Sequence, residues 1–127
     1  MDKEQIETLV QSYVKSYNRF DIAGMLKSIH PEICFKNISG DAVTASANGV
    51  HAFEALAEKA AAVFQERSQT IRSIDIQGRT ARVGIDYRGI LAADLSDDLK
   101  KGDTLALTGW SEFEFKEGKI ISLTDYS

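Results

Sequence analysis

The chain has 127 residues, a mass of 14.0 kDa, a net charge of −4 and a pI near 5.1. Its 43% hydrophobic and 27% charged residues are typical of a globular protein with an apolar core, so we expect one domain over residues 1–127. The acidic balance and the lack of any run of Lys or Arg argue against nucleic acid as a partner.

No apolar stretch approaches the roughly 20 residues that a membrane-spanning helix needs. The charged N-terminus, MDKEQIETL, also differs from a secretory signal. We therefore expect no membrane partner and a cytoplasmic location. The single cysteine, Cys34, permits no internal disulfide, which agrees with a reducing compartment, and its place in a predicted strand indicates a small buried side chain rather than a nucleophile.

The first predicted element is an amphipathic helix. Apolar residues recur at three- and four-residue spacing from residue 6 onward, which predicts a helix over residues 3–17 with Asp2 as its N-cap. Tyr13 and Tyr17 are one turn apart on the same apolar face. Both tyrosines are therefore expected to point inward.

A short helix and a strand follow. Asp21 can cap a helix over residues 22–29, and Pro31 makes its continuation improbable. The next residues alternate, which predicts a strand around residues 33–38. Asn37 shares its inward face with two apolar residues, so it is the first polar group expected to point toward the interior.

Residues 39–48 are small and polar, which favours a loop with a possible short return strand over residues 42–45. A long covering helix is predicted next, over residues 50–66. The apolar residues on its buried side are Phe53, Leu56, Ala60, Val63 and Phe64.

The period then changes from helical to alternating. Four strands are predicted, over residues 70–77, 80–92, 104–116 and 119–126, joined by hairpin-like connections. Helices followed by antiparallel strands indicate an α+β domain, with the helices on one face of a curved antiparallel sheet. Tyr87 shares a face with neighbouring apolar residues, so it can either line a cavity or complete the core.

The strand over residues 104–116 has one apolar face, which must face the helices. That face carries Leu105, Leu107, Gly109, Ser111, Phe113 and Phe115. The opposite face carries the only tryptophan, Trp110, among polar residues. A homodimer that packs sheet against sheet around Trp110 is one interpretation, and a tryptophan lying flat over neighbouring side chains is the other.

The chain resembles the nuclear transport factor 2-like superfamily, which includes ketosteroid isomerases and SnoaL-like polyketide cyclases. The resemblance covers nearly the whole chain, from VQSYVKSYNRFDIAGML through the covering helix to the final WSEFEF and GKII strands. It implies a cystatin-like, cone-shaped α+β fold with a pocket at the open end of the cone. It does not imply one function, because this fold carries enzymes, binding proteins and scaffolds.

The similarity to ketosteroid isomerases gives three positions a possible role. The oxyanion-hole tyrosine of that family falls on Tyr13, its catalytic base on Asn37 and its second oxyanion donor on Ser111. An amide cannot abstract a proton from carbon, so steroid isomerisation by the family mechanism is not expected. Tyr13, Asn37 and Ser111 can instead hydrogen-bond a ligand oxygen, or they can satisfy one another.

Other titratable residues are weaker candidates. His30 precedes a proline and is predicted to lie on the surface, and His51 falls in the first turn of the covering helix, near a possible pocket mouth. Asp86 should point outward. Asp125 is on a possible inward face but at the end of the last strand, where chains fray. The sequence contains no metal-ligand spacing and no phosphate-binding glycine motif, so no cofactor is predicted.

Three functions remain open. The first is a pocket that binds a small, mostly apolar molecule bearing an oxygen; the second is a cyclase, isomerase or dehydratase that uses Tyr13 with an unrecognised base such as His51 or Asp125; the third is a non-catalytic dimeric module. The expected pocket residues are Tyr13, Tyr17, Asn37, Phe53, Leu56, Phe64, Tyr87, Leu107, Ser111 and Phe113, and the expected dimer-interface residue is Trp110.

Overall fold

The computed structural model describes residues 1–127 and begins with helix α1, Lys3–Asn18. A capping box starts the helix: the Asp2 carboxylate accepts from the Gln5 backbone N–H at 2.8 Å, and the Gln5 side-chain oxygen accepts from the Asp2 N–H at 2.9 Å. Helix and cap lie where the sequence predicted them. No helix in the chain is both long enough and apolar enough to cross a membrane.

Helix α2, Ile22–Lys27, ends two residues before its predicted end, because strand β1, Ile29–Ser39, begins at Ile29. The Asp21 carboxylate caps it by accepting from the Gly24 N–H at 2.9 Å. At its other end, the Ser28 carbonyl accepts from the Ile120 N–H at 2.8 Å, so pairing with the last strand replaces the final helical turn.

Helix α3, Val50–Ala61, is shorter than predicted, and strand β3, Phe64–Gln77, begins six residues before the predicted residue 70. Phe64 pairs with Leu91 at the start of a long antiparallel ladder. The helical spacing of Phe64 after α3 was therefore misleading, because backbone pairing in the sheet decides its conformation.

The sheet has six strands in the order β2-β1-β6-β5-β4-β3. Its remaining strands are β2 (Ala42–Asn48), β4 (Thr80–Leu91), β5 (Thr104–Lys116) and β6 (Lys119–Tyr126). The prediction of an antiparallel sheet was wrong at one place: β1 and β6 pair in parallel, so the sheet is mixed. Strand β2 is also longer than the predicted return strand, because it forms a hairpin with β1.

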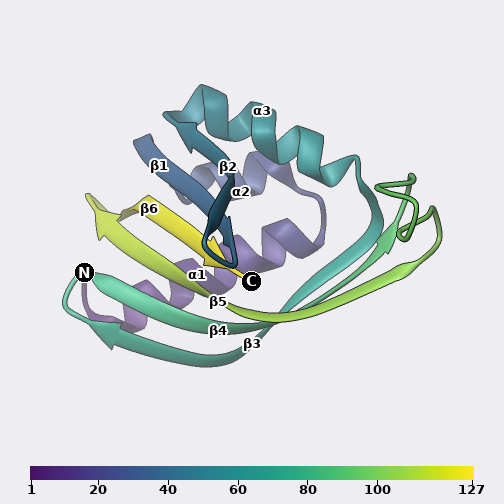
Figure 1. Cartoon of the computed structure of the whole chain (residues 1–127). Coiled ribbons are helices and arrows are strands. Elements are labelled where there is room, and N and C mark those ends of the chain that lie inside the picture. Colours follow the sequence, from purple (N-terminus) through teal and green to yellow (C-terminus); the bar gives the residue numbers. More distant parts are fainter.

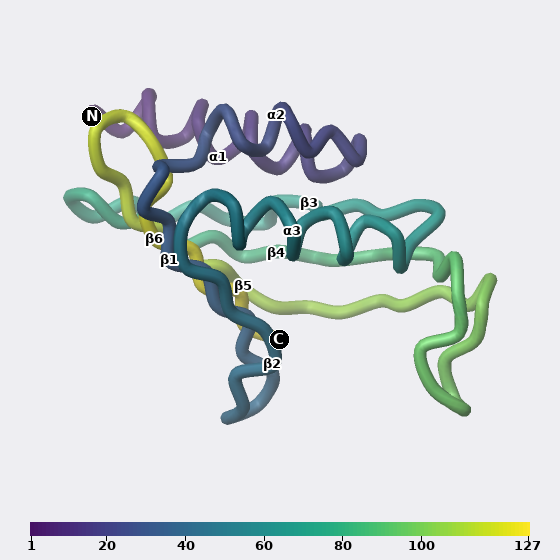
Figure 2. The backbone as a smooth tube through the Cα atoms, turned by 90° about the horizontal axis from the view of Figure 1, so that it is seen from above, coloured from purple at the N-terminus to yellow at the C-terminus, as the bar shows by residue number.

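The three helices lie on the concave side of the curved sheet, as predicted for a cone-shaped α+β fold (Figures 1 and 2). Strands β3, β4 and β5 are long and curve toward the C-terminal end of α3 (Figure 1). One apolar core joins α1, α2, α3 and the inner face of the sheet, and Val10, Ile33, Val83 and Ile120 are fully buried in it. The site described below lies between α3, α1 and the inner face of the sheet.

Trp110 lies on the other face of the sheet, partly exposed. Its ring stacks on Tyr126, with centroids 4.0 Å apart and planes 10° apart, and the Arg82 guanidinium lies 3.6 Å from its ring centroid. Trp110 is thus flanked by side chains of its own chain. A homodimer through this face stays a prediction.

The prediction of a surface position for His30 was wrong, since only 7% of this residue is exposed. Its Nδ1 accepts from the Glu32 N–H at 3.0 Å, which leaves Nε2 to carry the proton toward the Glu117 carboxylate at 3.2 Å. His30 belongs to strand β1, and pairing in the sheet draws it inward beside the β5–β6 turn.

Candidate functional site

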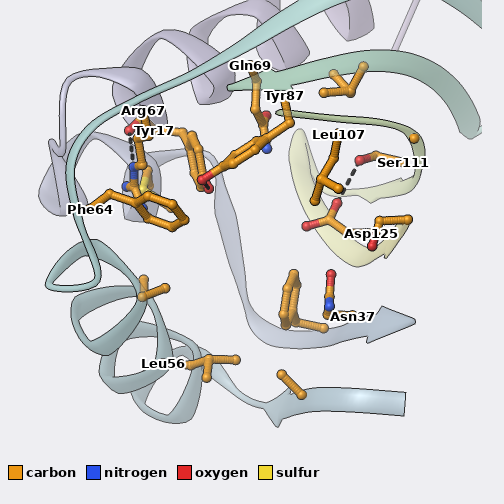
Figure 3. A pocket seen from close by; sticks show the side chains of 18 of the residues that line it. Tyr17, Asn37, Leu56, Phe64, Arg67, Gln69, Tyr87, Leu107, Ser111 and Asp125 are labelled. Atoms are coloured by element: carbon orange, nitrogen blue, oxygen red, sulfur yellow. Dashed lines mark hydrogen bonds between the residues drawn. The ribbon is translucent and has the colours of Figure 1, made fainter. Parts of the chain in front are cut away.

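A cavity of about 370 Å³ opens between α3, the C-terminal half of α1 and the inner face of the sheet (Figure 3). Fourteen of its 21 lining residues are hydrophobic. Its size and apolar walls are typical of a site for a small organic molecule.

All but one of the ten residues expected to form a pocket line this cavity. They are Tyr13, Tyr17, Asn37, Phe53, Leu56, Phe64, Tyr87, Leu107 and Ser111. The exception is Phe113, which faces inward but lies farther along β5, 3% exposed, with its ring edge-on to Tyr13 at 6.1 Å and stacked on Phe115. Phe113 is therefore a core residue that supports Tyr13.

The cavity also contains the carboxyl group of Asp125, a residue that its position near the chain end had predicted to fray. Strand β6 lies between β1 and β5, so Asp125 is held on both sides and does not fray. Its carboxylate accepts from the Ser111 hydroxyl at 2.6 Å (Figure 3). Burial raises the pKa of Asp125 from 3.8 to about 6, and the Ser111 hydrogen bond offsets part of that rise.

Tyr13, Asn37 and Ser111 all reach the cavity but do not satisfy one another. Ser111 donates to Asp125, and the Asn37 amide donates to Thr44 Oγ1 at 2.7 Å. Burial and the nearby Asp125 raise the pKa of Tyr13 well above its usual value. The Tyr13 hydroxyl is consequently neutral at ordinary pH and can donate to a ligand oxygen.

Two further tyrosines, Tyr17 on α1 and Tyr87 on β4, form another part of the cavity wall. The Tyr17 hydroxyl donates to the Tyr87 hydroxyl at 3.2 Å, and Phe64 packs edge-on against Tyr87 at 5.8 Å. Burial raises the pKa of both tyrosines, so these hydroxyls stay protonated as well. This wall is aromatic with polar tips, an arrangement that suits a flat ligand carrying an oxygen.

Arg67 also lines the cavity, although its sequence position indicated only the boundary after a helix and did not identify it as a site residue. It is 5% exposed. Its Nε donates to the Tyr17 carbonyl oxygen at 2.9 Å, and its guanidinium lies 3.7 Å from the Tyr17 ring centroid and 4.6 Å from that of Phe20. Arg67 alternates with inward-facing residues of strand β3, and this alternation is the signal that could have identified it.

The other titratable candidates lie elsewhere. His51 is exposed in the first turn of α3 and is not part of the cavity lining. Asp86 points outward, as predicted, 3.4 Å from the Arg72 guanidinium. No three side chains of His, Cys, Asp or Glu come close enough to hold a metal ion.

Replacing Ser111 by alanine is expected to raise the pKa of Asp125 further above its value of about 6, because a hydrogen bond to the charged form is lost. A ¹³C titration of the Asp125 side-chain carboxyl by NMR measures this directly. Ser111→Thr retains a hydroxyl and serves as the control. An unchanged pKa in Ser111→Ala would contradict the assigned role of the bond.

These features define a class of protein: a cone-shaped α+β domain with an apolar cavity and a carboxylic acid in the cavity wall. The chain belongs to the family of SnoaL-like domains, which it matches over residues 10–123. Its fold is that of the nuclear transport factor 2-like superfamily. No curated protein matches the sequence.

Solved structures of low sequence identity share this fold. TsrD from Streptomyces laurentii superposes with a TM-score of 0.79 at 17% identity, over 98% of this chain and 89% of TsrD. An LEH-like epoxide hydrolase from M. tuberculosis gives 0.77 at 13% identity, over 97% and 82%. A protein with a ketosteroid isomerase-like fold from Catenulispora acidiphila, crystallised with trimethylamine, gives 0.77 at 13% identity, over 94% and 84%.

Proposed function

We propose that the cavity binds a small, mostly apolar molecule bearing a carbonyl or hydroxyl group and that Asp125 transfers a proton on it. The observation that carries this proposal is a carboxyl group with a pKa of about 6 inside an apolar cavity. A general acid or base is most effective when its pKa lies near the working pH, and perturbed carboxyls concentrate at active sites.

The proposed reaction begins with the Asp125 carboxylate taking a proton from a carbon next to the ligand carbonyl. The electron pair of the broken C–H bond moves to the carbonyl oxygen, and the neutral Tyr13 hydroxyl donates a hydrogen bond to the resulting enolate. Protonated Asp125 then returns the proton to a ligand atom. If the ligand has a β,γ double bond, the enolate extends to the γ-carbon, and return of the proton there gives isomerisation. Attack of the enolate carbon on a second carbonyl, whose oxygen then takes the proton from Asp125, gives cyclisation.

Asn37 takes no proton in this scheme. Its amide is bonded to Thr44 and stays neutral, so the base acts from β6 rather than from the end of β1. The alternative is a cavity that binds its ligand without turnover. It differs from the enzyme only in whether Asp125 exchanges protons with the ligand.

Deuterium exchange at C1 of 2-tetralone, an apolar bicyclic ketone, tests that difference when it is followed by ¹H NMR in buffered D₂O at neutral pH. The wild-type protein is expected to speed exchange over buffer, and Asp125→Asn to lose at least tenfold of that acceleration. Asp86→Asn, an exposed carboxylate on the outer face, is the matched control and should behave as the wild type.

Two results separate the alternatives. Exchange that persists in Asp125→Asn would remove Asp125 as the acid–base group. Saturable binding of 2-tetralone by wild-type protein, with exchange no faster than in buffer, would favour the binding function over the enzyme.

A further inference from the structure

Arg67 is a buried cation whose side-chain nitrogens are only partly hydrogen-bonded. Its Nη2 is the one fully buried side-chain nitrogen or oxygen without a hydrogen-bond partner. No carboxylate lies within ion-pair distance of its guanidinium, whereas Arg72, five residues along the same strand, lies beside Asp86. The cavity wall thus contains a buried positive charge with no anion of its own.

The contacts that Arg67 makes satisfy only part of the hydrogen-bonding capacity of its guanidinium and leave its charge without a counterion. One backbone carbonyl and the faces of Tyr17 and Phe20 hold the guanidinium in place. Aromatic faces and a carbonyl attract a cation, but neither neutralises it, and a buried ion without a partner is unfavourable. The guanidinium is therefore held by these contacts but has no counterion.

The acid of the cavity does not complete it. Asp125 is bonded to Ser111 on β5, and Figure 3 shows Arg67 and Asp125 on opposite sides of the cavity, with Tyr87 and Gln69 between them. A molecule that spans the cavity would therefore meet a cation at one end and the acid–base group at the other.

We propose that Arg67 is an anion-binding residue and that the ligand is a small apolar carboxylic acid. The ligand carboxylate lies against the Arg67 guanidinium, with the Gln69 amide and the Tyr87 hydroxyl beside it, and the apolar body extends toward Asp125. A guanidinium presents planar N–H donors that match a carboxylate. This inference rests on the proposed function, since it names the class of ligand for the same cavity.

A purely structural role for Arg67, bracing the end of α1 through the Tyr17 carbonyl, makes a different prediction. A brace would affect every ligand through the shape of the cavity. An anion site distinguishes a charged ligand from a neutral one of the same shape.

The experiment measures binding of 2-naphthoate and of its neutral isostere 2-naphthamide by isothermal titration calorimetry at pH 7.5. The wild type is expected to bind the acid at least tenfold tighter than the amide. Arg67→Gln should abolish that preference while changing amide affinity by less than about threefold, and Arg67→Lys, which retains charge without the planar fork, should keep part of it. Arg72→Gln removes the same charge from the same strand outside the cavity and should change neither affinity.

Equal affinity of the wild type for the two probes would overturn the anion site and leave the cavity proposal intact, and so would a preference that survives in Arg67→Gln. Failure of both probes to bind the wild type would overturn both proposals. If Arg67→Gln does not fold, the wild-type preference and its reduction in Arg67→Lys decide the question, and an undiminished preference in Arg67→Lys together with its loss in Arg72→Gln would contradict the proposal.

Discussion

At pH 7.5 the Asp125→Asn variant is expected to be more stable than the wild type by roughly 2 to 3 kcal/mol, although it removes a hydrogen-bonded side chain from the site. The pKa of Asp125 rises from 3.8 to about 6 in the folded protein. A tenfold change in proton affinity corresponds to about 1.4 kcal/mol, and the residue is partly exposed, so the full product is an upper limit. The asparagine oxygen can still accept from Ser111, whereas the charge that the cavity disfavours is gone.

The direction of the pH dependence follows from proton binding. The folded wild type holds the Asp125 proton more tightly than the unfolded chain, so this group stabilises the fold fully below a pH of about 3.8 and loses its contribution as pH rises through about 6. Asparagine does not titrate. The two stability curves should therefore lie close together near pH 4, separate as the pH rises to about 6, and stay parallel above that pH.

Urea unfolding between pH 4 and pH 8 measures the two curves. Asp86→Asn is the control, because that carboxylate is exposed and paired with Arg72, and its removal should change stability by less than about 1 kcal/mol. A gap of equal size at pH 4 and pH 8 would instead indicate altered packing, and no gap at pH 7.5 would indicate an ordinary pKa for Asp125.

This cost explains why Asp125 is informative about function. A fold gains nothing in stability from placing a carboxyl where its charged form is disfavoured, and replacement by a neutral isostere is available in one substitution. A carboxyl group with a raised pKa is typical of sites where activity needs a proton acceptor near neutral pH. The same reasoning applies to the uncompensated guanidinium of Arg67.

The elements with strong local signals were predictable from sequence. Helix α1 was predicted to within one residue of its end because its cap and its apolar spacing agree, and β5 and β6 were predicted at their observed bounds because alternation has one consistent face. The α3–β3 boundary was not predicted correctly, because Phe64 satisfies both a helical and a strand pattern. The parallel β1–β6 pair joins distant segments, and no local pattern encodes it.

Some residues of the site could also be predicted from local patterns, and others could not. Its apolar walls and Ser111 follow from the alternation of β5, and Tyr13 from the face of α1. Arg67 was not identified, because charged residues are expected at the surface and only tertiary packing buries this one. Asp125 was named as a possible base on an inward face but was considered a weak candidate, because the end of the last strand was expected to fray. For Asp125 the missing fact was that β6 is an inner strand of the sheet.

Replacing Asn37 by aspartate is expected to destabilise the protein by about 2 kcal/mol at pH 8 and to raise the pKa of the acid pair above that of Asp125 alone. Asn37 and Asp125 are direct neighbours across the parallel β1–β6 pair, and both line the cavity. The substitution restores the carboxylate that the resemblance to ketosteroid isomerases implies at this position. It also places a second charge beside the one already disfavoured there.

Two neighbouring carboxyls in an apolar cavity cannot both ionise without cost, so the pair should share a proton over a wide pH range. ¹³C titration of the side-chain carboxyls measures the two apparent pKa values, and urea unfolding measures the loss in free energy of unfolding. The neutral variant Asn37→Ala, which also loses the bond to Thr44, separates the effect of charge from that of the lost amide. The double variant with Asp125→Asn should recover the stability, because it leaves a single carboxyl in the cavity. Destabilisation that persists in the double variant would show that the aspartate disturbs the packing of β1. Asn37 would then be needed for its contacts in β1 and not for its lack of charge.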